Sequence, residues 1–365
     1  MKAEFNRKEL LKAINGVKLA VPSRLVLPVL RNIIVGVNKS KGTLTATNLN
    51  TVIKASIKCK SSDIGEVMLP AKEFKAFVEA VNDCENVTIE LDGNEVQLKA
   101  GNHTVTLPTN TSDYPPIPTL KPSYSINILN LANQLKQIDW NMANQLKQID
   151  WNMAVDYSSP VLGTVHFDGK TLAAADGFTL GIAPVKIEGE SKPCDLMIPR
   201  EAAMSIIKLR MNEVKFEFSE IPQLMRVTHG NIELTTHCVQ GDYPDYNNVI
   251  PKSDSCSMTV DSKALLRSVK VMRIADSSPI TKLESMPEGL KIWKESHEFY
   301  QCEMGIQSSV EAKGDLKVAI SDQYLFNVLS RCKGNISISS TSISSPITIK
   351  NGDCTWVIMP MFVQW

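Results

Sequence analysis

The chain has 365 residues, of which 43% are apolar and 21% are charged, and its 39 Lys and Arg residues balance 39 Asp and Glu residues. This composition is typical of a globular protein and excludes a disordered or fibrous chain. Charge neutrality excludes a protein that holds nucleic acid by positive charge alone. No apolar stretch approaches about 18 residues, so no membrane span is expected. The N-terminus lacks the apolar core of a signal peptide. The eight cysteines form no Cys-x-x-Cys pair, which favours reduced thiols in a cytoplasmic protein.

The first predicted element is an amphipathic helix at residues 7–17. Leu10, Ala13, Ile14 and Val17 follow i, i+3, i+4, i+7 spacing there, which gathers them on one face. Pro70 precedes a second predicted helix at 71–82, and proline is favoured at helix starts. The alternating residues 87–91 then predict a strand.

The same order of elements returns twice further along the chain. Leu265, Val269 and Met272 form the apolar face of a helix in the last third. Second helices are predicted at 200–209 and 322–331, followed by alternating strands at 214–218 and 336–339. The Pro-rich residues 114–125 and the segment 253–257 predict joints between domains.

Local sequence echoes support a threefold repeat. Ser112-Asp113-Tyr114-Pro115 returns as Gly241-Asp242-Tyr243-Pro244, and residues 44–48 resemble residues 172–176. A period of about 120 to 130 residues is the size of a domain rather than of a solenoid repeat. We therefore predict an α+β protein of three similar domains at residues 1–120, 121–252 and 253–365, each with two helices packed on antiparallel sheets.

Cationic side chains recur on the polar faces of two predicted helices. Lys8 and Lys12 share a face of the first helix, and Lys263, Arg267 and Lys270 follow i, i+4, i+7 spacing in the last third. A single such face is most simply a solvated surface. Its recurrence favours a shared, mildly positive lining suited to loose, sequence-independent contact with phosphates.

Catalytic signatures are absent from the sequence. It contains no G-x-S-x-G, G-x-x-x-x-G-K-[ST], G-x-G-x-x-G or H-E-x-x-H motif. Asp113, Asp176, Asp242 and Asp245 lie in turn sequences, where a carboxylate binds its own backbone. With only five histidines and none in an i, i+4 pair, we expect no enzyme, no cofactor and no metal site.

Several motifs, in the right order, resemble those of the bacterial sliding clamp family, the beta subunit of DNA polymerase III. Residues 24–30 (RLVLPVL) resemble the family's R-x-x-L-P-I-L, and residues 44–50 resemble its L-x-x-T-A-T-D-L-E. Ala175-Asp176-Gly177 resembles T-D-G, residues 242–246 (DYPDY) resemble F-P-D-Y, and residues 357–361 (VIMPM) resemble V-V-M-P-M. The resemblance covers essentially the whole chain.

The resemblance implies a fold and a function. Three clamp domains per chain would dimerise into a six-domain ring around double-stranded DNA, with sheets outside and helices lining the hole. Such a processivity factor tethers the DNA polymerase III catalytic subunit, is placed by a clamp loader, and binds other proteins that carry clamp-binding motifs. The alternative is a divergent clamp-fold DNA-binding or repair accessory protein with altered partner specificity.

The resemblance also assigns sites. It places Arg24 at the DNA, beside Lys8, Lys12, Lys147, Lys263, Arg267 and Lys270. It places the dimer interface at Val105 and Leu107 of the first domain and near Val271 and Met272 of the third. It implies a pocket for partner peptides at Leu162, Ala175, Gly177, Phe178, Thr179, Leu180, Pro244, Val249, Val357, Met359, Pro360 and Met361.

Three features depart from the family pattern. Phe178-Thr179 stands where the family has His-Arg, and the tail continues as residues 362–365 (FVQW). Ala132–Met142 is repeated letter for letter as Ala143–Met153. The duplication could lengthen the channel-lining helix, or one of the two copies could be surplus. We favour the second interpretation. We expect the second copy to take the normal helix position, because it joins the following strand directly.

Overall fold

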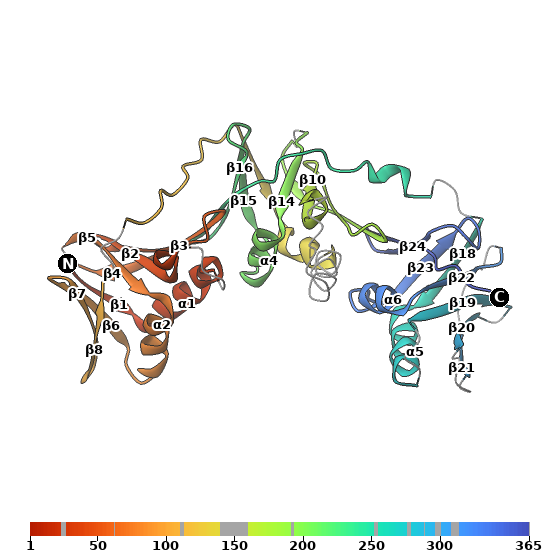
Figure 1. Ribbon diagram of the computed structural model, residues 1–365, viewed down its shortest axis with the longest axis horizontal. Helices are drawn as coiled ribbons and strands as arrows, with labels where there is room; N and C mark the ends of the chain where they lie inside the picture. The colour runs from red at the N-terminus through yellow and green to blue at the C-terminus, as the bar shows by residue number, and fades with distance from the viewer. Residues whose placement is uncertain are drawn as a thin grey trace. The chain divides into compact units, whose positions relative to one another are not determined.

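The computed structural model describes residues 1–22, 27–61, 63–109, 113–138, 160–190, 193–251, 255–275, 279–287, 289–295, 301–307 and 314–364 (Figure 1). Within them the chain repeats one order of elements three times: a strand, a helix, four strands, a second helix and three strands. The first copy comprises β1 (Lys2–Asn6), α1 (Arg7–Val17), β2 (Asn32–Asn38), β3 (Lys41–Thr47), β4 (Thr51–Lys60), β5 (Ile64–Pro70), α2 (Ala71–Ala80), β6 (Asn86–Asp92), β7 (Glu95–Ala100) and β8 (His103–Pro108).

The second and third copies follow the same order. The second has β9 (Tyr124–Ile128), a helix at 131–138, β10 (Thr164–Phe167), β11 (Thr171–Ala175), β12 (Thr179–Pro184), an additional short β13 (Ile187–Glu188), β14 (Leu196–Pro199), α4 (Arg200–Lys208), β15 (Val214–Ser219), β16 (Leu224–His229) and β17 (Ile232–His237). The third has β18 (Cys256–Asp261), α5 (Ser262–Ala275), β19 (Ile280–Met286), β20 (Gly289–Glu295), β21 (Gln301–Gln307), β22 (Lys317–Ser321), α6 (Asp322–Leu329), β23 (Asn335–Ser340), β24 (Ile347–Asn351) and β25 (Cys354–Ile358). The predicted α+β class and threefold repeat are confirmed.

The chain forms two compact units, and the second copy contributes to both. One unit comprises Met1–Ala132, Lys186–Ser191 and Ile198–Val239, and the other comprises Asn133–Val185, Lys192–Met197 and Gln240–Trp365. In the first unit, β17 pairs antiparallel with β4, with Leu234 opposite Ile53. In the second, β25 pairs antiparallel with β12, with Val357 opposite Leu180. Each unit therefore contains one sheet that continues from one copy into the next.

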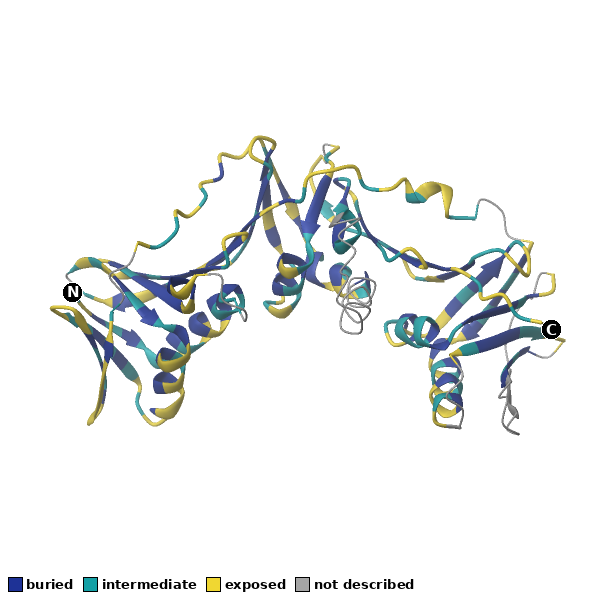
Figure 2. Cartoon of the chain, viewed as in Figure 1, coloured by how far each residue is buried: buried dark blue, intermediate teal, exposed yellow. Residues whose placement is uncertain are grey.

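The helices pack through the apolar faces that the sequence predicts (Figure 2). Leu10 and Ile14 of α1 are fully buried, and so are Leu265 and Met272 of α5. The Asn6 side chain caps α1, because its Oδ1 accepts hydrogen bonds from the backbone amides of residues 8 and 9 at 3.1 and 3.2 Å. α1 is confirmed at its predicted ends, whereas α2, α4 and α6 end one or two residues earlier than predicted, a common uncertainty at fraying helix ends.

The structure describes only part of the tandem duplication. Residues 139–153, which include Lys147 and the whole second copy, lie outside the described residues. In the first copy, Leu135 and Ile138 are fully buried, and the Trp356 indole Nε1 donates to the Gln137 carbonyl at 3.2 Å. The first copy therefore supplies a packed helix. The expectation that the second copy takes the normal helix position falls on residues outside the described part of the chain and stays a prediction.

Candidate functional site

A cavity of about 220 Å³ opens in the second unit, and its walls are almost entirely apolar. It is lined by Leu162, Ala175, Gly177, Phe178, Thr179, Leu180, Tyr243, Pro244, Asp245, Tyr246, Val249, Val357 and Met359. An apolar cavity of about 150 Å³ already accommodates a benzene ring. This cavity therefore has room for one aromatic or two small aliphatic side chains.

The floor of the cavity is the sheet formed by β11, β12 and β25. Ala175 lies opposite Leu180 across β11 and β12, and Leu180 lies opposite Val357 across β12 and β25. Leu180 and Val357 are buried together with Ala173, and Tyr246 packs against this cluster. Because the floor is part of a hydrogen-bonded sheet, its position does not depend on a ligand.

The turn between β11 and β12 forms one wall and depends on Asp176. The Asp176 Oδ1 accepts hydrogen bonds from the Phe178 amide at 3.0 Å, and from the amide and hydroxyl of Thr179, both at 2.8 Å. Gly177 has a φ of +86°, a conformation that glycine adopts without strain. The turn leaves the Phe178 side chain 55% exposed at the cavity rim.

The opposite wall is the segment from Tyr243 to Val249. Asp245 caps the short helix η4 (Tyr246–Asn248), accepting from the Asn247 amide at 3.1 Å. The Tyr243 ring stacks on His166 at 5.0 Å between ring centroids, and Tyr246 meets His166 edge-on at 5.9 Å. Burial raises the pKa of Tyr243, so this phenol stays neutral at physiological pH.

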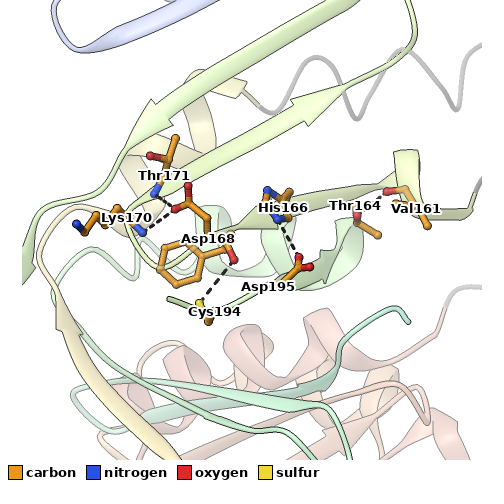
Figure 3. Close-up of polar contacts among 9 residues, drawn as sticks. Val161, Thr164, His166, Asp168, Lys170, Thr171, Cys194 and Asp195 are labelled. Carbon is orange, nitrogen blue, oxygen red and sulfur yellow. Dashed lines mark hydrogen bonds and ion pairs between the residues drawn. The ribbon is translucent and has the colours of Figure 1, made fainter. Parts of the chain in front are cut away.

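Figure 3 shows polar contacts of β10, of the turn that follows it and of the segment before β14, including those of His166, on which Tyr243 stacks. His166 Nε2 lies 2.9 Å from Asp195 Oδ1, which fixes the ring on which Tyr243 stacks. Asp168 Oδ1 accepts from the Lys170 and Thr171 amides at 2.8 and 2.6 Å, closing the turn between β10 and β11. The wall thus belongs to a hydrogen-bonded framework.

The C-terminal tail completes the rim after β25 ends. The Met359 amide donates to the Phe178 carbonyl at 2.9 Å, and the Met361 amide donates to the Ala319 carbonyl at 2.7 Å. Further on, the Lys282 Nζ donates to the Gln364 carbonyl at 2.9 Å. The tail is held at three points, while the Phe362 side chain is 90% exposed.

The arrangement is suited to binding rather than to bond-making chemistry. Among the described residues, Asp245 is the one charged residue in the lining, and the Asp176 carboxylate is engaged by the turn. Within the described part of the chain, no cluster of three or more His, Cys, Asp or Glu residues could hold a metal. Such an apolar, preformed cavity with few polar groups is typical of a site that receives side chains of a ligand.

The structure brings together ten of the twelve residues predicted for the peptide pocket. Pro360 and Met361 follow the lining residue Met359 in the tail but do not themselves line the cavity. Sequence reasoning missed Tyr243, Asp245 and Tyr246, although they belong to the quoted segment DYPDY. Its two tyrosines at i, i+3 spacing were the available signal for an aromatic wall.

The predicted DNA-binding residues that are described lie on two helix surfaces. Lys8 and Lys12 are exposed on α1, and Lys263, Arg267 and Lys270 are exposed on α5. Within the described residues, no ion pair involves any of the five. Arg24 and Lys147 lie outside the described residues.

The residues predicted for the dimer interface differ in exposure. Val105 on β8 is 40% exposed and Val271 on α5 is 41% exposed, whereas Leu107 and Met272 are buried within the chain. Ile274 near the end of α5 was not predicted, yet it is 88% exposed. Only the exposed members of this set offer apolar surface to a second molecule.

The element order and sheet pairing define a protein built from repeated clamp domains, and three comparisons agree. Residues 1–118 match the family described as "DNA polymerase III beta subunit, N-terminal domain". The chain is 22% identical to the beta sliding clamp of Vibrio cholerae over 99% of this chain and 100% of the relative. It is 25% identical to the beta sliding clamp of Pseudomonas putida over 98% of each chain.

Solved structures show the same fold over the whole chain. The DNA polymerase sliding clamp of Bacillus subtilis superposes with a TM-score of 0.89 at 19% identity, covering 100% of both chains. The beta clamp of Helicobacter pylori, solved with a DNA ligase peptide, superposes with a TM-score of 0.82 at 19% identity, covering 99% of this chain and 100% of that one. The resemblance drawn from sequence motifs is confirmed, since the chain is similar to bacterial beta sliding clamps in sequence and in fold over nearly its whole length.

Proposed function

We propose that this chain is a DNA sliding clamp, a non-enzymatic processivity factor that encircles duplex DNA and tethers replication enzymes to it. The observation that carries the proposal is the clamp fold over the full chain combined with a preformed and largely apolar pocket. In this proposal the three copies form clamp domains at residues 1–120, 121–252 and 253–365. The protein acts in the cytoplasm, and no helix among the described residues has the length and apolarity to cross a membrane.

Sheet pairing supports closure into a head-to-tail dimer. In both joints within the chain, the last strand of one copy pairs with the third strand after the first helix of the preceding copy, as β17 does with β4 and β25 with β12. By the same rule β8 would pair with β21 of a second chain. Among the described strands, both lie at the ends of their sheets, and an edge strand can pair its backbone groups with another chain. Two identical β8–β21 joints would close a two-chain ring of six domains.

The exposed cations on α1 and α5 support contact with the enclosed DNA. Lysine and arginine side chains attract phosphates without reading sequence, which suits a ring that must slide. Retention would come from closure of the ring, so a neutral protein with 39 cations and 39 anions does not need high intrinsic affinity for DNA.

Retention on closed DNA tests this proposal. The protein, loaded on nicked circular DNA with a clamp loader, should remain bound through gel filtration and be lost when a restriction enzyme cuts the circle. A protein that binds DNA by direct affinity would survive linearisation, and that result would contradict the proposal.

The apolar pocket is the proposed docking site for partner peptides. These would come from the DNA polymerase III catalytic subunit, the clamp loader and other proteins with clamp-binding motifs. A chain truncated after Ile358 loses the lining residue Met359 but retains all of β25. It should form the dimer and lose peptide binding, as measured by fluorescence polarisation and light scattering. Undiminished peptide affinity would place the docking site elsewhere.

A further inference from the structure

Carboxylates lie at the apolar pocket and in the segments that form its walls. Asp245 lines the cavity, Asp176 holds the turn beneath Phe178, and Asp242 is exposed directly before Tyr243. Among the residues that the structure describes, no Lys or Arg contributes to the lining. Within the described part of the chain, none of the three carboxylates forms an ion pair with a cation.

Neutral groups fix two of these carboxylates in place. Asp245 accepts from the amide and side-chain nitrogen of Asn247, both at 3.1 Å, and from the Asn248 Nδ2 at 2.9 Å. Asp176 accepts from the Phe178 amide and from the amide and hydroxyl of Thr179. Neutral donors orient a carboxylate but leave its net charge uncancelled. The pocket therefore presents an immobile negative charge to an incoming ligand.

Two of these carboxylates, together with Asp168, also act on Tyr246 of the lining and on Tyr324 of α6. The pKa of Tyr246 is raised by burial and then by Asp168 and Asp245. The pKa of Tyr324 is raised by burial and then by Asp176. In both cases the charges that raise the pKa of the phenol are carboxylates.

We infer that the pocket selects partner peptides in which apolar anchor side chains are flanked by a basic residue, and that it discriminates against acidic flanks. This inference rests on the proposed docking function and specifies the chemistry of its ligands. The anchors would fill the apolar cavity, and the flanking Lys or Arg would lie at the rim near Asp245. Complementary charge at an interface gives specificity in this way even where each contact is weak.

Three synthetic peptides test the inference on the full-length chain. They share Leu and Phe anchors and carry Lys, Gln or Glu beside the anchors. At about 50 mM salt we expect the Lys peptide to bind about fivefold more tightly than the Gln peptide, and the Glu peptide about fivefold less tightly. At about 300 mM salt screening should reduce these differences. Equal affinities at low salt, or tightest binding of the Glu peptide, would overturn the inference.

Single substitutions distinguish the effect of charge at the pocket rim from other effects on peptide affinity. Asp245→Asn keeps an oxygen that caps η4 and should reduce the preference for the Lys peptide. Asp353→Asn removes an exposed carboxylate outside the lining and should leave the preference unchanged. Phe178→Arg places a cation at the rim and should invert the order. If no peptide binds, the docking function itself fails, whereas binding without charge preference refutes only this inference.

Discussion

At the scale of single residues, Asp176 shows how much of the pocket depends on one side chain. Its Oδ1 accepts three hydrogen bonds from the two residues that follow Gly177. Each such bond contributes about 1 kcal/mol. Asp176→Ala should therefore weaken peptide binding about tenfold or more, because the turn that carries Phe178 loses its fixed shape. Asp176→Asn retains an acceptor and should weaken binding less. Titration with a fluorescent peptide measures both, and equal affinities for the two variants would contradict this role.

A second prediction at the scale of single residues concerns a buried thiol and the stability of the fold at alkaline pH. Burial raises the pKa of Cys238 to about 12, whereas an unfolded thiol has a pKa of about 8.5. Because the folded pKa is the higher one, the stabilisation is complete below about pH 8.5 and declines as pH rises toward 12. Between these two pKa values, ionisation of the Cys238 thiol in the unfolded state should lower the free energy of unfolding by up to about 1.4 kcal/mol per pH unit.

Denaturation midpoints between about pH 8.5 and 11 test the effect on the Cys238→Ala variant. Its stability should fall less steeply with pH than that of the parent protein. Cys84→Ala is a suitable comparison because Cys84 is only partly buried, and it should change the slope less. Parallel slopes for Cys238→Ala and the parent would show that Cys238 does not titrate as expected.

At the scale of elements, apolar periodicity identified the helices and strands well. Leu10 and Ile14 on α1, and Leu265 and Met272 on α5, are fully buried as their spacing predicts, because a single face of each helix meets the sheets. Tyr243 and Tyr246 were missed as pocket residues because their contact with His166 links positions about 80 apart in sequence. Local patterns do not contain that information, and only the resemblance indicated the rest of the pocket.

The exposed face of α5 carries a prediction about DNA. Replacing Lys263, Arg267 and Lys270 with Gln removes three exposed cations without touching the buried face. Loading on circular DNA should fall, with a shallower dependence on salt, because each lost phosphate contact removes one released counterion. The dimer should persist. The matched control replaces Lys41, Lys54 and Lys58, which are exposed on β3 and β4. If both variants lose DNA loading to the same extent, the effect is due to net charge and not to the position of the cations on α5.

The tandem duplication carries a prediction about the helix at 131–138. Since the two copies are identical, deleting Ala132–Met142 or Ala143–Met153 gives the same chain. Leu131 would be followed by the same residues as before, and positions 135 and 138 would keep their buried Leu and Ile. The melting temperature and dimer mass should therefore be nearly unchanged. A large loss of stability would show that both copies contribute to the fold.

At the scale of the whole molecule, the β8 edge is the point where the proposed ring is most easily broken. Val105 is 40% exposed, so Val105→Asp places a charge in the proposed joint without disturbing the core of the chain. We expect monomers by sedimentation or light scattering. Ile221→Asp is the control, because Ile221 is 92% exposed in the turn between β15 and β16. A dimer that persists with Val105→Asp would exclude β8 from the interface.

The C-terminal tail, which three hydrogen bonds hold in place, has a genetic consequence. The residues that complete the pocket rim follow the last strand, so a premature stop codon after Ile358 should remove the proposed docking site and spare the surfaces proposed for assembly. Its product would enter rings with intact subunits and leave them with one docking site in place of two. Such an allele should be dominant over the normal copy. A stop codon within β25 should instead be recessive, because its unfolded product would be degraded.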